Sequence, residues 1–254
     1  MEYQIIEEKK FRYIEQGEGH PLILLHGLFG ALSNWKDVLE QFSPHYKVII
    51  PLMPIYDLPI LRTNVKSLSR FIHKFIAFKG YTSFSLIGNS LGGHVALVYA
   101  TSHPEGVKNL ILTGSSGLYE NSSMGGSYPR RGDRDFIKEK VEYTFYAPES
   151  ATPELVDEVF EIVNNRLRII KILALAKSAI RHNMSKDVAK ITIPTCLIWG
   201  KDDKITPPDV AEEFHRLIPH SDLFWVDRCG HAPMMERPKE FNAILADWLK
   251  GKTD

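Results

Sequence analysis

The chain has 254 residues, of which 44% are hydrophobic and 24% charged, the composition of an ordinary globular protein. Its 31 lysine and arginine residues balance its 31 aspartate and glutamate residues, so no net positive field attracts nucleic acid. No apolar run approaches the roughly 18 residues of a membrane span, and the first residues lack the pattern of an export signal. We therefore expect a cytoplasmic protein without a nucleic-acid or membrane partner.

The first 80 residues predict strands that alternate with helices. Residues 3–16 alternate loosely between apolar and polar side chains, which favours a hairpin. Residues 21–25 (PLILL) are too short for a helix and are typical of a strand covered on both faces. The chain then predicts, in order, a loop at 26–30 (HGLFG), a capped helix over 33–42, a strand over 46–51, a proline-rich loop over 51–59 and a helix over 65–78.

The central stretch is Ser83 to His94, SFSLIGNSLGGH. An apolar run leads into Gly88-Asn89-Ser90-Leu91-Gly92, an instance of G-x-S-x-G, and helical spacing of apolar residues follows. A strand that reverses into a helix over one residue needs neighbours without bulk, because that residue is strained and its side chain points outward. Strand, turn and helix are the context that a nucleophile elbow requires, so Ser90 is the candidate nucleophile.

The rest of the chain contains one interruption of the strand and helix pattern. Residues 107–112 predict another buried strand, whereas residues 118–188 contain a polar loop at 121–135 and helical patterns with no strand among them. Strand, helix, strand and helix then resume at 195–199, 210–217, 222–226 and 238–249. This order predicts an α/β fold with a mainly parallel sheet covered by helices.

Two further residues complete a candidate catalytic set with Ser90. A serine hydroxyl needs a base within hydrogen-bond reach, and that base needs a third group to orient it. His231 and Asp203 each lie in a loop just after a predicted strand, where both can face the same crevice. The chain order of Ser90, Asp203 and His231 is the order expected for α/β-hydrolases.

The sequence resembles the α/β-hydrolase superfamily in four motifs that span nearly the whole chain. The motifs are HGLFG at 26–30, GNSLGG at 88–93, WGKDDKITP at 199–207 and CGH at 229–231. The resemblance implies an eight-stranded, mostly parallel sheet with a helical lid between strands six and seven. The hydrolase core would then comprise residues 1–117 and 189–254, and the lid residues 118–188.

The resemblance also implies roles for individual residues. The spacing from Gly200 to Pro207 selects Asp203 over Asp202 as the acid of the triad. The backbone N–H groups of Leu28 and Leu91 would form an oxyanion hole. Asn89 and Phe29 are candidate substrate contacts, and no histidine spacing or glycine-rich phosphate loop indicates a metal or a cofactor.

These features predict a serine hydrolase that cleaves a small carboxylic ester through an acyl-enzyme. A second hypothesis is a C–C bond hydrolase of the meta-cleavage-product type, because GNSLGG resembles those enzymes and Arg166 falls roughly where they bind a carboxylate. Against it, HGLFG replaces their glycine-rich HGGGPG loop, Ala232 replaces a tryptophan, and Arg166, with Arg168 and Lys171 nearby, is better explained as part of a solvated helix face. A third hypothesis is a ligand-binding receptor or regulatory module with a slow triad. The sequence does not assign the acyl preference, the oligomeric state or the role of residues 51–59.

Overall fold

An eight-stranded sheet forms the centre of the protein in the computed structural model, which describes residues 3–30, 35–119 and 130–252. The strand order is β1-β2-β4-β3-β5-β6-β7-β8. β1 and β2 pair antiparallel, β2 pairs antiparallel with β4, and every pair from β4 to β8 is parallel. The strands are β1 (Ile6–Glu8), β2 (Phe11–Gln16), β3 (Pro21–Leu25), β4 (Lys47–Pro51), β5 (Phe84–Asn89), β6 (Val107–Thr113), β7 (Thr195–Gly200) and β8 (Ser221–Val226). The predicted α/β-hydrolase fold with its mostly parallel sheet is confirmed.

The inner strands are apolar because both of their faces are covered. Every residue of β5 and of β7 is buried, whereas β8, at the edge of the sheet, keeps its first five residues partly or fully exposed. A continuous apolar run is what a parallel strand between two helix layers requires, since neither face meets water. This burial fixes the carboxyl ends of β5, β6 and β7 side by side at one end of the sheet.

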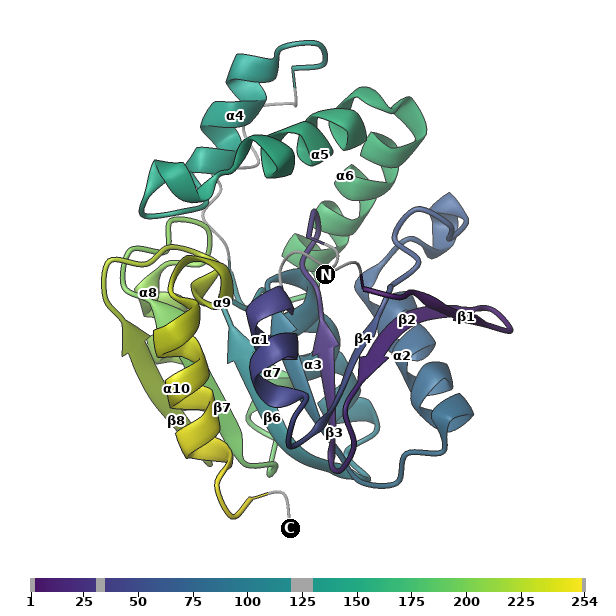
Figure 1. Ribbon diagram of the computed structural model, residues 1–254, viewed down its shortest axis with the longest axis vertical. Helices are drawn as coiled ribbons and strands as arrows, with labels where there is room; N and C mark the ends of the chain where they lie inside the picture. The colour runs from purple at the N-terminus through teal and green to yellow at the C-terminus, as the bar shows by residue number, and fades with distance from the viewer. Residues whose placement is uncertain (1–2, 31–34, 120–129, 253–254) are drawn as a thin grey trace.

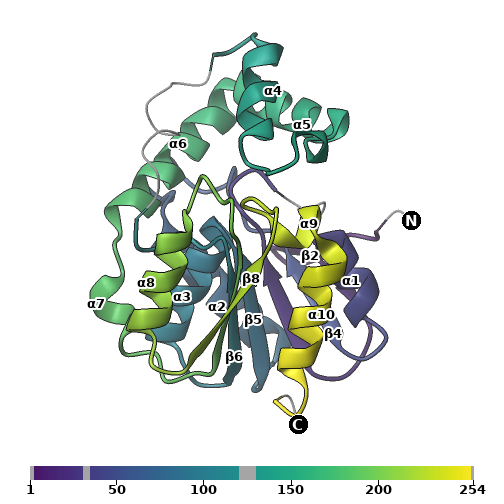
Figure 2. The same ribbon diagram turned by 90° about the vertical axis from the view of Figure 1, so that its left-hand side faces the viewer.

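Helices cover both faces of the sheet (Figures 1 and 2). One layer contains α1 (Lys36–Phe42), α9 (Pro233–Glu236) and α10 (Pro238–Leu249), which contact one another. The other contains α2 (Val65–Lys79), α3 (Leu91–Ser102) and α8 (Pro208–Leu217). A short 3-10 helix, η2 (Ile60–Arg62), precedes α2. Within the described part of the chain, no helix is long and apolar enough to cross a lipid bilayer.

A helical insertion leaves the sheet after β6 and returns at β7. It contains α4 (Arg134–Glu142), η4 (Pro148–Ser150), α5 (Pro153–Asn164), α6 (Arg166–Arg181) and α7 (Ser185–Val188). Its described residues include no strand. α4, α5 and α6 lie over the carboxyl end of the sheet, whereas α7 contacts α3 and α8 (Figures 1 and 2). Most of the expected 121–135 loop, together with the expected cap at 33–34, lies outside the described residues.

Candidate active site

Ser90 has a strained backbone at the junction of β5 and α3. Its φ of 55° and ψ of −121° are uncommon for a residue with a side chain. Three backbone hydrogen bonds hold this conformation: its N–H donates to Thr113 O at 3.2 Å, and its carbonyl accepts from the N–H groups of His94 and Ser116 at 3.1 Å each. Strain that is held by several bonds in this way is typical of functional sites.

The turn at Ser90 is possible because α3 starts in direct contact with the end of β3. A Cβ added at Gly92 would collide with the carbonyl oxygen of Leu25, so only glycine permits this approach. The following loop, HGLFG, reaches Ser90 itself, because a Cβ added at Gly27 would lie 3.4 Å from the Cβ of Ser90. The sequence motifs at 26–30 and 88–93 are therefore neighbours in space.

The two residues of the expected oxyanion hole, Leu28 and Leu91, belong to these two motifs. Leu91 is the first residue of α3, and a first-turn N–H has no acceptor inside its own helix. Leu28 follows Gly27 in the loop beside Ser90. The loop is held by His26, whose Nδ1 lies 2.9 Å from Gly27 O and whose Nε2 accepts from Met53 N–H at 3.1 Å. Burial lowers the pKa of His26, so this brace is a neutral imidazole near neutral pH.

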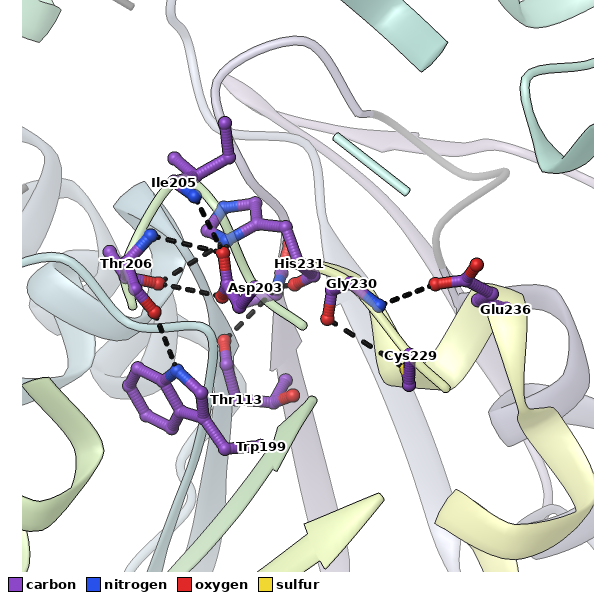
Figure 3. A network of polar contacts seen from close by, with 10 residues as sticks. Thr113, Trp199, Asp203, Ile205, Thr206, Cys229, Gly230, His231 and Glu236 are labelled. Atoms are coloured by element: carbon purple, nitrogen blue, oxygen red, sulfur yellow. Dashed lines mark hydrogen bonds and ion pairs between the residues drawn. The ribbon is translucent and has the colours of Figure 1, made fainter. Parts of the chain in front are cut away.

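Asp203 and His231 form a buried pair at the carboxyl end of the sheet (Figure 3). His231 Nδ1 lies 2.9 Å from Asp203 Oδ2, the orientation in which Nδ1–H donates and Nε2 is left as the basic nitrogen. Asp203 Oδ1 accepts from the N–H groups of Ile205 at 2.8 Å and Thr206 at 3.0 Å, and Oδ2 accepts from Thr206 Oγ1 at 2.9 Å. All four partners donate, as an ionised carboxylate requires.

Asn89 joins the Ser90 turn to the His231 loop. Its side-chain amide donates to Thr113 O at 3.0 Å and to His231 O at 3.1 Å, and the residue is buried. Both bonds are internal to the fold, so the geometry gives Asn89 a positioning role. The expected contact between Asn89 and substrate stays a prediction.

The helical insertion packs directly on the His231 loop. His231 N–H donates to Thr144 O at 2.9 Å, and a Cβ added at Gly230 would lie 2.6 Å from the same oxygen. Glu236 bridges the two segments, since its carboxylate accepts from Gly230 N–H and from Ala147 N–H at 2.6 Å each. Figure 3 shows the Glu236 side chain directed at Gly230. The histidine loop is thus held by the insertion as well as by the core.

Two residues of this network were not singled out from the sequence. Thr206 lies within the WGKDDKITP motif, three residues after Asp203, and that spacing is the signal by which it can be found. Glu236 follows His231 by five residues, and its role depends on Ala147, which is 89 residues away in the chain. No local pattern predicts that second contact.

The remaining expected site residues lie further from the pair. Asp202 donates its N–H to Cys229 O at 2.9 Å, and it is Asp203 that meets His231. Phe29 is half-buried and packs against the core. Arg166 is exposed at the first position of α6, at the end of that helix remote from the sheet (Figure 1). This position favours the solvated-face interpretation of Arg166.

The described residues contain no group of three or more histidine, cysteine, aspartate and glutamate side chains that could hold a metal ion. Cys196 and Cys229 are both free and buried. Burial raises the pKa of both thiols, which keeps them protonated and poor ligands near neutral pH.

This combination of a strained serine after a strand, a glycine-containing loop beside that serine and a buried aspartate–histidine pair is that of an α/β-hydrolase. The family model for the alpha/beta hydrolase family matches residues 22–244, and the chain belongs to that family.

Similar proteins include several kinds of hydrolase. An alpha/beta hydrolase enzyme from a metagenome of lagoon sediments at Mar Chica, Morocco, is 46% identical, with a TM-score of 0.80 over 97% of this chain and 98% of that one. The 2-hydroxy-6-oxo-6-(2'-aminophenyl)hexa-2,4-dienoic acid hydrolase of Metapseudomonas resinovorans is 27% identical over 96% of this chain and 88% of its own length. Lipase 3 of a Moraxella species is 27% identical over 87% of this chain and 75% of its own length.

Proposed function

We propose that the protein is a serine hydrolase that cleaves small carboxylic esters, with Ser90, His231 and Asp203 as its catalytic triad. The observation that carries the proposal is the strained Ser90 turn, which a buried Asn89 joins to a histidine paired with Asp203 at 2.9 Å. A serine held in such a turn and a histidine oriented by a carboxylate are the two parts that acyl transfer requires.

In the proposed mechanism, Ser90 Oγ attacks the ester carbonyl carbon and its proton passes to His231 Nε2. The N–H groups of Leu28 and Leu91 hold the negative oxygen of the tetrahedral intermediate, each contributing about 2.7 to 4 kcal/mol. The intermediate collapses, the alcohol leaves with the proton from His231, and an acyl-Ser90 ester remains. Water then attacks this ester while His231 takes its proton, and His231 returns that proton to Ser90 Oγ as the acid is released.

The position of Arg166 favours a carboxylic ester over a C–C bond as the group that is cleaved. A C–C hydrolase for a carboxylate-bearing dienol needs a cation for the substrate carboxylate, and the candidate, Arg166, is exposed at the outer end of α6. The C–C hydrolase stays the second candidate because a relative with that named activity covers 96% of the chain. We also propose that the helical insertion acts as a lid. We further propose a cytoplasmic location, because the two cysteines, Cys196 and Cys229, are free and buried.

The test is hydrolysis of p-nitrophenyl esters of increasing acyl length by the wild type and by Ser90→Ala. We expect turnover by the wild type and a loss of at least about a thousandfold in the variant, the share of catalysis that such triads carry. Residual activity within about tenfold of the wild type would show that Ser90 is not the nucleophile.

The alternatives give different results in the same assay. If no ester is cleaved but a carboxylate-bearing dienol diketone is, and Arg166→Ala abolishes that cleavage, the C–C hydrolase replaces the proposal. A ligand that raises the melting temperature without being turned over would favour the receptor hypothesis.

A further inference from the structure

Part of the surface of α6 is both apolar and basic. Residues 167, 170, 174, 177 and 181 recur every three or four positions and so share one face of the helix. Leu167 is 75% exposed and Ile170 43% exposed on this face, where a solvated helix normally presents polar side chains. The helix carries five cationic side chains and no acidic one: Arg166, Arg168, Lys171, Lys177 and Arg181.

The chain before α2 continues the same surface. Lys171 Nζ donates to Leu58 O, and Val65 N–H donates to Ser178 Oγ at 3.2 Å, so residues 58–65 run alongside α6. In Figure 1 this segment is the blue loop that faces the green helix α6. At its tip, in η2, Leu61 is 92% exposed, which is extreme for a leucine.

A groove of about 520 Å³ separates the two segments. Leu61 and Ala174 supply apolar lining, and three cations, Lys66, Lys177 and Arg181, line it as well. None of these cations forms an ion pair with a residue that the structure describes. We call the whole surface the basic face and define it by Leu61, Lys66, Leu167, Ile170, Lys177 and Arg181.

Acidic side chains near the basic face are few. Residues 58–66 contain none, and neither does α2. Asp187 is influenced by Lys66, but its carboxylate lies 2.7 Å from Lys190 Nζ, which is the main cause of its lowered pKa. Because the whole chain has equal numbers of acidic and basic residues, this face is a local excess of positive charge.

From this arrangement we infer that the basic face attaches the protein to the surface of an anionic lipid assembly. Exposed Leu61, Leu167 and Ile170 would enter the boundary between headgroups and acyl chains, as the apolar face of an interfacial helix does. Lys66, Lys177 and Arg181 would hold phosphate headgroups in the groove between the segments. The inference is independent of the proposed function, because no residue of the basic face belongs to the proposed triad.

Charge favours a lipid surface over a second copy of the chain. In a symmetric dimer the same patch meets itself, so the cations of one face would lie against those of the other. An anionic surface removes that repulsion and accepts protruding apolar side chains at the same time. The expectation of no membrane partner rested on the lack of a long apolar run, a criterion that concerns spanning segments and not surface attachment.

The test is cosedimentation with vesicles of phosphatidylcholine alone and of phosphatidylcholine mixed with phosphatidylglycerol. We expect the wild type to bind the mixed vesicles and to dissociate from them as the salt concentration is raised. It should not bind vesicles of phosphatidylcholine alone. Lys177→Gln with Arg181→Gln, and separately Leu61→Ser, should each weaken binding by about tenfold or more.

Matched controls separate this surface from general charge and from misfolding. Lys36→Gln with Lys239→Gln removes two exposed cations from the α1 and α10 layer and should leave binding unchanged. Every variant should keep the wild-type circular dichroism and ester turnover.

Three results would overturn the inference. The first is no binding to mixed vesicles at low salt. The second is an equal loss of binding in the control pair. The third is binding of glycerol phosphate or polyglutamate, dependent on Lys177 and Arg181, by a protein that does not bind vesicles. That result would indicate a soluble anion or an acidic protein as the partner.

Discussion

Asp203 accepts four hydrogen bonds through its two carboxylate oxygens, and this explains how one loop after β7 can hold the base of the proposed triad. Thr206 secures the carboxylate from both its backbone and its side chain. Asp203 Oδ2 also lies 2.9 Å from His231 Nδ1, which selects the tautomer that carries its proton on Nδ1. Asp202, one position earlier, donates its backbone N–H to Cys229 O.

Asp203→Asn should lower turnover by about 10⁴-fold with little change in KM, because an amide at this position favours the wrong tautomer of His231. Asp202→Asn is the matched control and should stay within about twofold of the wild type, as substitutions away from a buried network do. Steady-state ester hydrolysis measures both. Equal losses in the two variants would mean that Asp203 does not orient the base.

A second residue-scale feature is the pair formed by the buried His94 and the half-buried His182. His94 is fully buried in α3, and its Nε2 lies 3.0 Å from His182 Nδ1. Burial, with the nearby His182, lowers the pKa of His94 from 6.5 to about 3. Between pH 6.5 and about 3, His94 is therefore protonated in the unfolded chain and neutral in the folded chain. The free energy of unfolding carries no penalty from His94 above pH 6.5, and it decreases as the pH falls below that value.

We expect the free energy of unfolding to decrease below pH 6.5 by up to about 1.4 kcal/mol per pH unit through His94. His94→Gln should flatten that decrease, whereas His220→Gln, at an exposed position, should leave it unchanged. Denaturant titrations on either side of pH 6.5 measure the slopes. Identical slopes in the wild type and in His94→Gln would refute the buried, uncharged state of His94.

At the scale of elements, the insertion and the core meet at the histidine loop. Glu236, at the end of α9, accepts from Gly230 in that loop and from Ala147 in the insertion. These two hydrogen bonds couple the position of His231 to the segment of the insertion that joins α4 to η4. A change at Glu236 should therefore affect catalysis as well as stability.

Glu236→Gln keeps the shape but offers only one acceptor oxygen, so one buried N–H loses its partner at a cost of about 1 to 3 kcal/mol. We expect a lower melting temperature together with slower ester turnover. Glu240→Gln, exposed on α10, should change neither quantity. If turnover stayed at the wild-type level while the melting temperature fell, Glu236 would stabilise the fold without positioning His231.

At the scale of the whole molecule, the parts that the sequence predicted are those set by local patterns. The buried strand before Ser90, the helix after it and the hairpin over residues 6–16 follow from periodicity and from glycine spacing. The sequence did not predict contacts between distant segments, such as those of Thr144 with His231 and of Ala147 with Glu236. They depend on how an insertion of helices packs on the core, which no local spacing encodes.

The same limit applies to the candidate site. Ser90, Asp203 and His231 lie in recognisable motifs at strand ends, where a parallel sheet brings loops together. The amide of Asn89 donates to Thr113 O and His231 O, because its position at the end of β5 directs it between two neighbouring strand-end loops, and the expected contact of Asn89 with substrate stays a prediction.

Labelling by a fluorophosphonate tests whether Ser90 is an activated nucleophile, without knowledge of the substrate. We expect one adduct per chain in the intact mass, located by peptide mapping on Ser90 and absent from Ser90→Ala. An unlabelled wild type, or an adduct that persists in Ser90→Ala, would contradict it.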